Sequence, residues 1–178
     1  MLGTELPDAD HVSRYSKPTA VGRDGLPMAA AFELRAGEDH LSVNWLEYFG
    51  VPNHEAAVGH VRNAFQAKGY RLGRNGRFAA LNVGTVKAAV SETLDGPARI
   101  EHLPVDDDES HSGVFGYAAD DLAVAVAIKA LVSAENVFPA VTDRAHPRHK
   151  TPDAVHEPLR HPAKLPAGTA VYGRLKTR

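Results

Sequence analysis

The hydrophobic period changes sharply near residue 50, and this change constrains the fold more than any other feature of the sequence. In the segment 41–45, apolar and polar residues alternate, which is the two-residue period of a half-buried strand. From Asn53 to Lys68, apolar residues recur at helical spacing, and Asn53 is a preferred residue for capping a helix start. The chain is therefore expected to combine a β-sheet with helices that cover it.

Further along the chain the same combination returns. Asn75-Gly76 separates two β-compatible runs, 70–73 and 77–83, and predicts a two-residue hairpin. A helical pattern follows over 84–94, and then a strand over 98–103. The order strand, helix, strand predicts a βαβ unit whose two strands are parallel.

A third helix is predicted after Asp120-Asp121. Its sequence, LAVAVAIKALVSAEN, is apolar nearly all round, which is typical of a buried helix. Together the patterns predict an α+β fold, a mixed β-sheet with about three helices and a basic Pro/His-rich C-terminal tail. We divide the chain into an N-terminal lead-in (1–18), a single α+β domain (19–140) and a basic extended tail (141–178).

The composition is that of an ordinary soluble protein. The 178 residues are 43% hydrophobic and 24% charged, and none is cysteine, which excludes disulfides and thiolate metal ligands. The acidic start MLGTELPDAD is unlike a secretory signal. The longest uncharged apolar run, 122–128, is far shorter than the ~20 residues that cross a bilayer. We therefore expect a cytoplasmic protein without a membrane span.

Charge is distributed unevenly along the chain. Residues 144–178 contain eight Lys or Arg and two acidic residues, whereas the remainder contains twelve Lys or Arg and twenty acidic residues. A basic tail behind an acidic body is typical of an arm that binds nucleic acid or another polyanion. It is equally consistent with a tail that lies on its own acidic body. The tail residues predicted to bind a partner are Arg144, Arg148 and Lys150.

The predicted hairpin carries a second basic group. It consists of four cations with no acid between them: Lys68, Arg71, Arg74 and Arg77. Arg74 and Arg77 flank the turn, and like charges placed opposite each other destabilise a strand pair, so an anionic partner would relieve them. The alternative is a solvated hairpin tip, where charged side chains are common. Gly73-Arg74-Asn75-Gly76 also fits a GxxG loop, but that loop joins two helices in RNA-binding KH domains.

Histidines and carboxylates in the stretch PVDDDESHSGVFG and just before it form a candidate catalytic group. Imidazole with carboxylate suits general acid and base catalysis or a divalent transition metal. The selected catalytic residues are His111, His102, Asp106 and Asp108. No established metal-ligand spacing is present, and the alternative is a solvated acidic turn in which Ser110 or Asp108 caps the backbone.

His11-Val12-Ser13 matches one half of the His-x-Ser/Thr pattern of two-histidine phosphoesterases. The same spacing occurs at His40-Leu41-Ser42 and at His149-Lys150-Thr151, so the pattern does not single out His11. The sequence lacks a Gly-x-Ser-x-Gly elbow, a P-loop, a Gly-x-Gly-x-x-Gly fingerprint and a kinase motif. These absences argue against the common hydrolase and nucleotide-binding classes.

The order HVSRY, LSVNWLEYF, PVDDDESHSGVFG resembles that of small uncharacterised bacterial proteins, which carry a similar Asp-x-Ser-His stretch before a Gly-containing strand. The resemblance covers about residues 10–138 and leaves out the tail. It implies that His111 and its neighbours belong to a shared structural or functional feature. It implies no established activity and no catalytic residue.

The leading functional expectation is a non-enzymatic binding or accessory protein that contacts nucleic acid or an acidic protein surface through the Arg-lined hairpin and the basic tail. The alternative is a small histidine-dependent hydrolase or phosphoesterase, with or without a metal ion. The positions of the histidines in three dimensions distinguish these two functions, because two imidazoles that converge with a carboxylate in a pocket favour the enzyme. The sequence assigns no cofactor.

Overall fold

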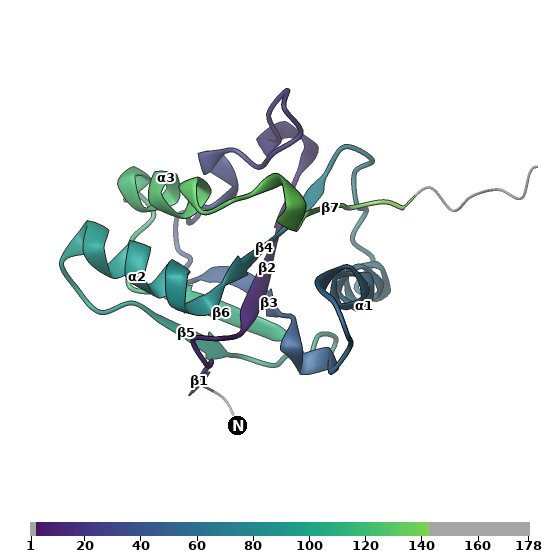
Figure 1. Cartoon of the computed structure of the whole chain (residues 1–178), viewed down its shortest axis with the longest axis horizontal. Coiled ribbons are helices and arrows are strands. Elements are labelled where there is room, and N and C mark those ends of the chain that lie inside the picture. Colours follow the sequence, from purple (N-terminus) through teal and green to yellow (C-terminus); the bar gives the residue numbers. More distant parts are fainter. Residues whose placement is uncertain (1–2, 143–178) are drawn as a thin grey trace, which may run out of the picture. The chain divides into compact units, whose positions relative to one another are not determined.

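The computed structural model describes residues 3–142, which form one β-sheet with helices on both faces (Figure 1). The sheet has seven strands in the order β1-β5-β6-β3-β2-β4-β7, and every adjacent pair is antiparallel. The strands are β1 (Thr4–Glu5), β2 (His11–Ser16), β3 (Leu41–Trp45), β4 (Arg77–Asn82), β5 (Arg99–His102), β6 (His111–Phe115) and β7 (Val137–Pro139).

The predicted α+β class with three helices is confirmed, whereas the pairing within the sheet differs from the expected mixture. Strands β4 and β5, predicted as a parallel pair, do point the same way, since four antiparallel steps separate them. They do not pair, because β2, β3 and β6 lie between them. The two edges of β4 are paired with β2 and β7, and those of β5 with β1 and with β6, the next strand along the chain.

Helix α1 (His54–Ala67) forms where its sequence predicts. Oδ1 of Asn53 accepts a hydrogen bond from the backbone N–H of Ala56 (2.9 Å), which satisfies one of the free donors at the helix start. Gly69, with a φ of 76°, ends the helical segment in the left-handed conformation that glycine adopts without strain.

The other two helices lie on the opposite side of the sheet from α1 (Figure 1). Helix α2 (Val83–Leu94) begins one residue before the predicted start and is capped by Asn82, and Asp95 ends it with a φ of 51°. Helix α3 (Leu122–Ala130) is shorter than its apolar sequence suggested. Single turns of 3-10 helix occur at η1 (Pro18–Ala20), η2 (Ala29–Ala31), η3 (Glu47–Phe49) and η4 (Ala134–Asn136).

Each face of the sheet has its own hydrophobic core. Alternate residues of a strand point to opposite faces, so Phe78 and Ala80 of β4 pack under α1, while Ala79 and Leu81 pack under α2 and α3. The expected all-round burial of α3 is wrong, because its side chains at 122 and 126 are 56% and 52% exposed. Only the face that carries Val124, Ala125 and Ile128 is buried.

The segment 1–18, expected to be a lead-in, supplies β1 and β2 instead. Strand β2 lies inside the sheet between β3 and β4. Its sequence, HVSRYS, concealed this role because two of its inward positions are serines, Ser13 and Ser16, which are 0% and 1% exposed. Small polar side chains can occupy an interior strand where neighbours crowd it on both sides.

The hairpin predicted around Asn75-Gly76 does not form. Residues 70–72 have no strand partner, and the N–H of Gly73 donates instead to the hydroxyl of Tyr15 (3.1 Å). Strand β4 pairs with β2 and β7. Arg74 and Arg77 therefore do not face each other across a strand pair, and the repulsion argued for them is absent.

The chain divides into two units after Asp143. Of the predicted tail (141–178), residues 143–178 lie outside the described residues. Within residues 3–142 no helix has the length and apolar character needed to span a membrane.

Candidate metal centre

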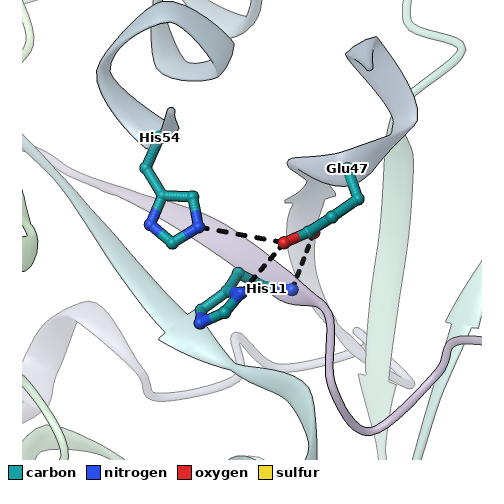
Figure 2. Close-up of side chains that lie close together, drawn as sticks. All are labelled: His11, Glu47 and His54. Atoms are coloured by element: carbon teal, nitrogen blue, oxygen red, sulfur yellow. Dashed lines mark hydrogen bonds and ion pairs between the residues drawn. The ribbon is translucent and has the colours of Figure 1, made fainter. Parts of the chain in front are cut away.

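Three elements meet beside the start of β2, and each contributes its first residue. His11 comes from β2, Glu47 from η3 and His54 from α1 (Figure 2). The backbone N–H of Leu46 donates to the carbonyl oxygen of His11 (2.9 Å), which joins the start of η3 to β2. The Asn53 cap fixes where α1 begins and so fixes His54.

The carboxylate of Glu47 holds the group together. Its Oε2 accepts a hydrogen bond from the backbone N–H of His11 (2.7 Å). Its Oε1 lies 2.9 Å from Nδ1 of His11 and 3.8 Å from Nε2 of His54. The centroids of the two imidazole rings are 4.3 Å apart. One oxygen of Glu47 is therefore shared between two histidines, while the other is fixed by the backbone.

This spacing suits a metal ion. One donor atom from each residue lies within 4.8 Å of the other two. Ligands bound at about 2.1 Å around a tetrahedral zinc ion lie roughly 3.4 Å from one another. The two distances to Oε1, 2.9 Å and 3.8 Å, fall on either side of that value. Small side-chain rotations would thus place an ion among His11, Glu47 and His54.

The donor set also indicates which ions fit. Imidazole nitrogen with a single carboxylate suits Zn²⁺, Co²⁺ or Fe²⁺, whereas Mg²⁺ and Ca²⁺ favour sites made of oxygen ligands. Within residues 3–142 the group has three members. Three protein ligands are typical of catalytic zinc sites, which keep a further position for water, while structural sites are closed by four.

Electrostatics favour the metal-binding form of His54. Burial lowers the pKa of His54 and the neighbouring His11 lowers it further, while Glu47 acts in the opposite direction. A lowered pKa keeps the imidazole neutral near pH 7, and only the neutral ring binds a metal ion. The side chains of His11, Glu47 and His54 are 29%, 35% and 30% exposed, so a small ligand can reach them.

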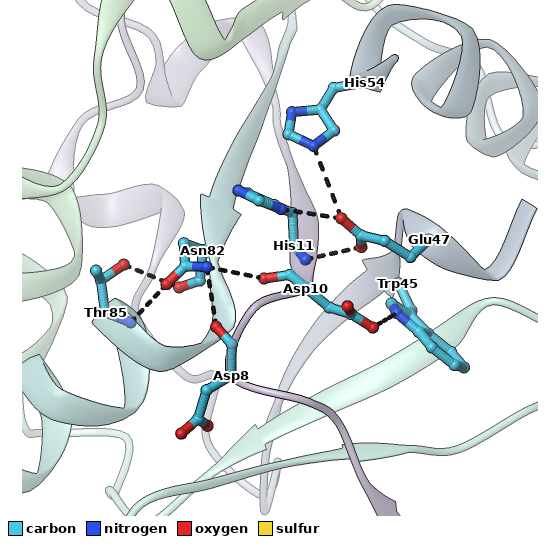
Figure 3. Close-up of polar contacts among 8 residues, drawn as sticks. All are labelled: Asp8, Asp10, His11, Trp45, Glu47, His54, Asn82 and Thr85. Carbon is cyan, nitrogen blue, oxygen red and sulfur yellow. Dashed lines mark hydrogen bonds and ion pairs between the residues drawn. The ribbon is translucent and has the colours of Figure 1, made fainter. Parts of the chain in front are cut away.

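A second layer of polar contacts supports His11 (Figure 3). Asp10, which precedes it, accepts a hydrogen bond at Oδ2 from Nε1 of Trp45 (2.8 Å). Asn82 lies directly opposite His11 in the β2–β4 register, and its side-chain amide donates to the backbone of the segment 8–10. The chain that leads into His11 is therefore fixed on two sides.

The structure does not bring the two predicted catalytic histidines together. His102 is paired with Ser112, so its side chain lies on the opposite face of the sheet from that of His111. Nε2 of His102 contacts the carbonyl oxygen of Glu109 (2.6 Å), and Nδ1 of His111 contacts that of Leu103 (2.9 Å). Burial is the main cause that lowers the pKa of His111.

The two predicted catalytic acids lie in different environments. Asp106 lies at the exposed tip of a tight turn closed by backbone hydrogen bonds between Val105 and Asp108. Asp108 is buried and accepts hydrogen bonds from Asn44, Ser110 and Lys68. The turn lines a hollow of about 300 Å³ together with Tyr48, Phe49 and Ala64. These hydrogen bonds fix the Asp108 carboxylate within the turn, so Asp108 serves the packing of the turn.

The predicted basic group is likewise divided. Nζ of Lys68 lies 3.1 Å from Oδ2 of Asp108. Arg77 is half-buried in β4 and donates to the carbonyl oxygen of Gly76, while Arg71 and Arg74 are exposed on the loop before β4. Arg144, Arg148 and Lys150 lie outside the described residues.

Little in the sequence indicates the candidate metal centre. Glu47 and His54 lie close along the chain, and the predicted cap at Asn53 already placed His54 at a helix start. His11 is marked in the sequence only as half of a phosphoesterase pattern, which two other histidines share. Sequence separation hides it, because only the pairing of β2 with β3 and β4 brings it to Glu47.

No protein-family model matches the chain, and comparisons with curated proteins and with solved structures found no significant match. The resemblance of residues 10–138 to small bacterial proteins stays a sequence-based expectation. The geometry of the centre is therefore the basis for any functional proposal.

Proposed function

We propose that this protein binds a divalent transition metal ion through His11, Glu47 and His54 and acts as a metal-assisted hydrolase. The observation that carries the proposal is the convergence of two imidazoles on one oxygen of Glu47, from three separate elements. The class is that of the sequence-based alternative, a histidine-dependent hydrolase, with His11 and His54 in place of His102 and His111.

The chemistry follows from the open coordination positions. A metal ion held by three side chains keeps a position for water and lowers the pKa of that water to about 7. An ion held by His11, Glu47 and His54 would supply such an activated water for attack on a carbonyl carbon or a phosphorus atom, with loss of the leaving oxygen or nitrogen. The partial exposure of all three ligands lets a substrate approach the ion.

Cobalt binding tests the metal site directly. Metal-free protein is titrated with Co²⁺, whose visible absorption reports nitrogen and oxygen ligation. We expect one tight equivalent in the unmodified protein and its loss in Glu47→Gln and His54→Ala. His60→Ala is the matched control, because His60 lies on the same helix and stacks on Phe49 (4.9 Å between ring centroids). Equal binding by Glu47→Gln would reject this site.

Hydrolysis is then measured on carboxylic and phosphoric p-nitrophenyl esters. The zinc-loaded protein should release p-nitrophenol faster than the metal-free protein, and Glu47→Gln should abolish the difference. If the metal-loaded protein hydrolyses neither class of ester and no amide, the protein binds a metal ion but is not a hydrolase.

A second candidate function is the sequence-based expectation of polyanion binding. Its support is the loop before β4, where Tyr70 is 61% exposed beside the exposed Arg71 and Arg74. Aromatic and basic side chains together suit single-stranded nucleic acid, whose bases stack and whose phosphates pair with cations. Binding to labelled RNA and DNA across salt concentration tests it, since phosphate contacts must weaken steeply as salt rises. We expect the double variant Arg71→Ala with Tyr70→Ala to lose nucleic-acid binding, and the control Arg35→Ala to keep it.

A further inference from the structure

The segment that leads into His11 is fastened to the start of α2. Nδ2 of Asn82 donates to the carbonyl oxygens of Asp8 (2.9 Å) and Asp10 (3.2 Å). Two backbone N–H groups of α2 reach the same carbonyls, from Gly84 to Asp8 (3.0 Å) and from Val83 to Asp10 (2.8 Å). Both carbonyl oxygens therefore accept two hydrogen bonds, one of each pair from Asn82.

The other side of Asn82 has a different task. Its Oδ1 accepts a hydrogen bond from the N–H of Thr85 (3.0 Å), which caps α2. The hydroxyl of Thr85 donates to the carbonyl oxygen of Asn82 (2.9 Å). The two ends of the Asn82 amide therefore have different partners: the oxygen caps α2, and the nitrogen donates to the segment 8–10 (Figure 3).

The fit between this segment and α2 is close. A Cβ atom added to Gly84 would lie 3.0 Å from the carbonyl oxygen of Asp8 and 3.1 Å from its Cβ. Trp45 holds the Asp10 side chain from the opposite direction. The peptide group that joins Asp10 to His11 therefore has little freedom, and its N–H is the donor that fixes Oε2 of Glu47.

We propose that Asn82 is a positioning residue of the metal centre, acting through the segment 8–10 on His11 and on the carboxylate of Glu47. This inference rests on the proposed metal binding. Asn82 acts through the backbone, because it holds the peptide whose N–H orients Glu47. Residues that orient ligands in this way typically change metal affinity by about 10-fold to 100-fold when replaced.

The two halves of the Asn82 amide make the test specific. Asn82→Ser keeps an oxygen that can cap α2, because serine caps helices about as well as asparagine. It lacks a side-chain nitrogen that reaches Asp8 and Asp10. Thr85→Ala is the matched control, since it removes a hydrogen bond at the same helix start and leaves the contacts of Asn82 to the segment 8–10 in place.

We expect Asn82→Ser to bind Co²⁺ at least about 10-fold more weakly than the unmodified protein, with a changed visible absorption band. Thr85→Ala should keep both the affinity and the band. If Asn82→Ser binds within two-fold of the unmodified protein and with the same band, the inference is wrong while the metal site stands. If the unmodified protein binds no Co²⁺, the metal site itself is wrong, and this inference falls with it.

A measurement on the unmodified protein covers the case in which Asn82→Ser does not fold. Coupling between two sites is reciprocal, so an ion that benefits from Asn82 must stabilise the contacts of Asn82 in return. Hydrogen exchange of the amides of Val83, Gly84 and Thr85 should slow when Zn²⁺ is added. Unchanged exchange at these amides, with Zn²⁺ bound, would overturn the positioning role.

Discussion

At the scale of single residues, the shared oxygen of Glu47 can interact with a protonated imidazole as well as with a metal ion. Without a metal, a proton on either imidazole can be held between that histidine and the carboxylate. With a metal, the ion takes the place of the proton. Protons and metal ions therefore compete for His11 and His54, and the pKa of His54 sets part of the outcome.

Metal affinity should therefore depend on pH in a defined direction. An ordinary imidazole has a pKa of about 6.5, so affinity must fall as the pH drops through that region. Because burial lowers the pKa of His54, that ring holds a proton less well than an exposed histidine, and its competition begins at a lower pH. Co²⁺ titrations between about pH 5 and 8 measure this. An affinity that is independent of pH would contradict imidazole ligation.

A second prediction at this scale concerns Asp108. Burial alone raises the pKa of Asp108, but hydrogen bonds from Ser110, Asn44 and Lys68 together lower it below the ordinary value. A carboxylate with a lowered pKa stabilises the fold at neutral pH, and this contribution is lost as the pH falls through the pKa. Asp108→Asn leaves Lys68, whose side chain is only 18% exposed, without its partner charge.

We expect Asp108→Asn to lower the free energy of unfolding by about 3 kcal/mol, the usual cost of removing one partner from a buried pair. Urea denaturation at pH 7 measures the change. Glu109→Gln is the control, since Glu109 is exposed and its removal should cost less than about 1 kcal/mol. Equal effects of the two substitutions would mean that the Lys68–Asp108 pair adds nothing.

At the scale of elements, two glycines distinguish open from crowded backbone. Gly59 lies inside α1, and a Cβ added there would meet no atom within 4 Å. Gly59→Ala should therefore stabilise the protein by about 0.5 to 1 kcal/mol, because alanine loses less entropy in a helix.

A Cβ on Gly73 would lie 2.4 Å from Cγ of Pro18. Gly73→Ala should cost about 1 to 3 kcal/mol through overpacking, measured by the same urea titrations.

The same elements show how far sequence patterns reach. Helix α1 and strand β3 could be predicted because period, cap and terminal glycine all agree locally. The hairpin at Asn75-Gly76 failed although its turn residues are favourable. Gly73 packs against Pro18 and Tyr15, and β4 finds its partners in β2 and β7, so contacts distant in sequence outweighed a local preference.

The candidate site was less predictable for the same reason. His102 and His111 are near each other in sequence, yet the alternation of strand residues sends them to opposite faces. His11 and His54 are far apart in sequence, and their meeting depends on β2 lying inside the sheet. That position could not be inferred from HVSRYS, whose buried serines break the expected apolar pattern.

At the scale of the whole molecule, the candidate metal centre lies between the sheet and α1, on one face of the sheet. Helix α1 is the only α-helix of residues 3–142 on that side, and it rests on a smaller core than α2 and α3 do. Its start would be tied to β2 by the ion, and its C-terminal end is tied to the turn at Asp108 by Lys68. An ion bound only by the folded chain must stabilise that chain as a whole.

Zinc should therefore raise the melting temperature. At a free concentration 100 times its dissociation constant, a ligand adds about 2.7 kcal/mol to the free energy of unfolding. For a protein of this size that corresponds to a rise of about 5 to 10 °C. Differential scanning fluorimetry of the full chain, with and without Zn²⁺, measures it. Glu47→Gln keeps all ten histidines of the chain, so any shift caused by zinc elsewhere appears in both proteins. The rise should be confined to the unmodified protein, and an equal rise in Glu47→Gln would place the stabilising ion somewhere other than this centre.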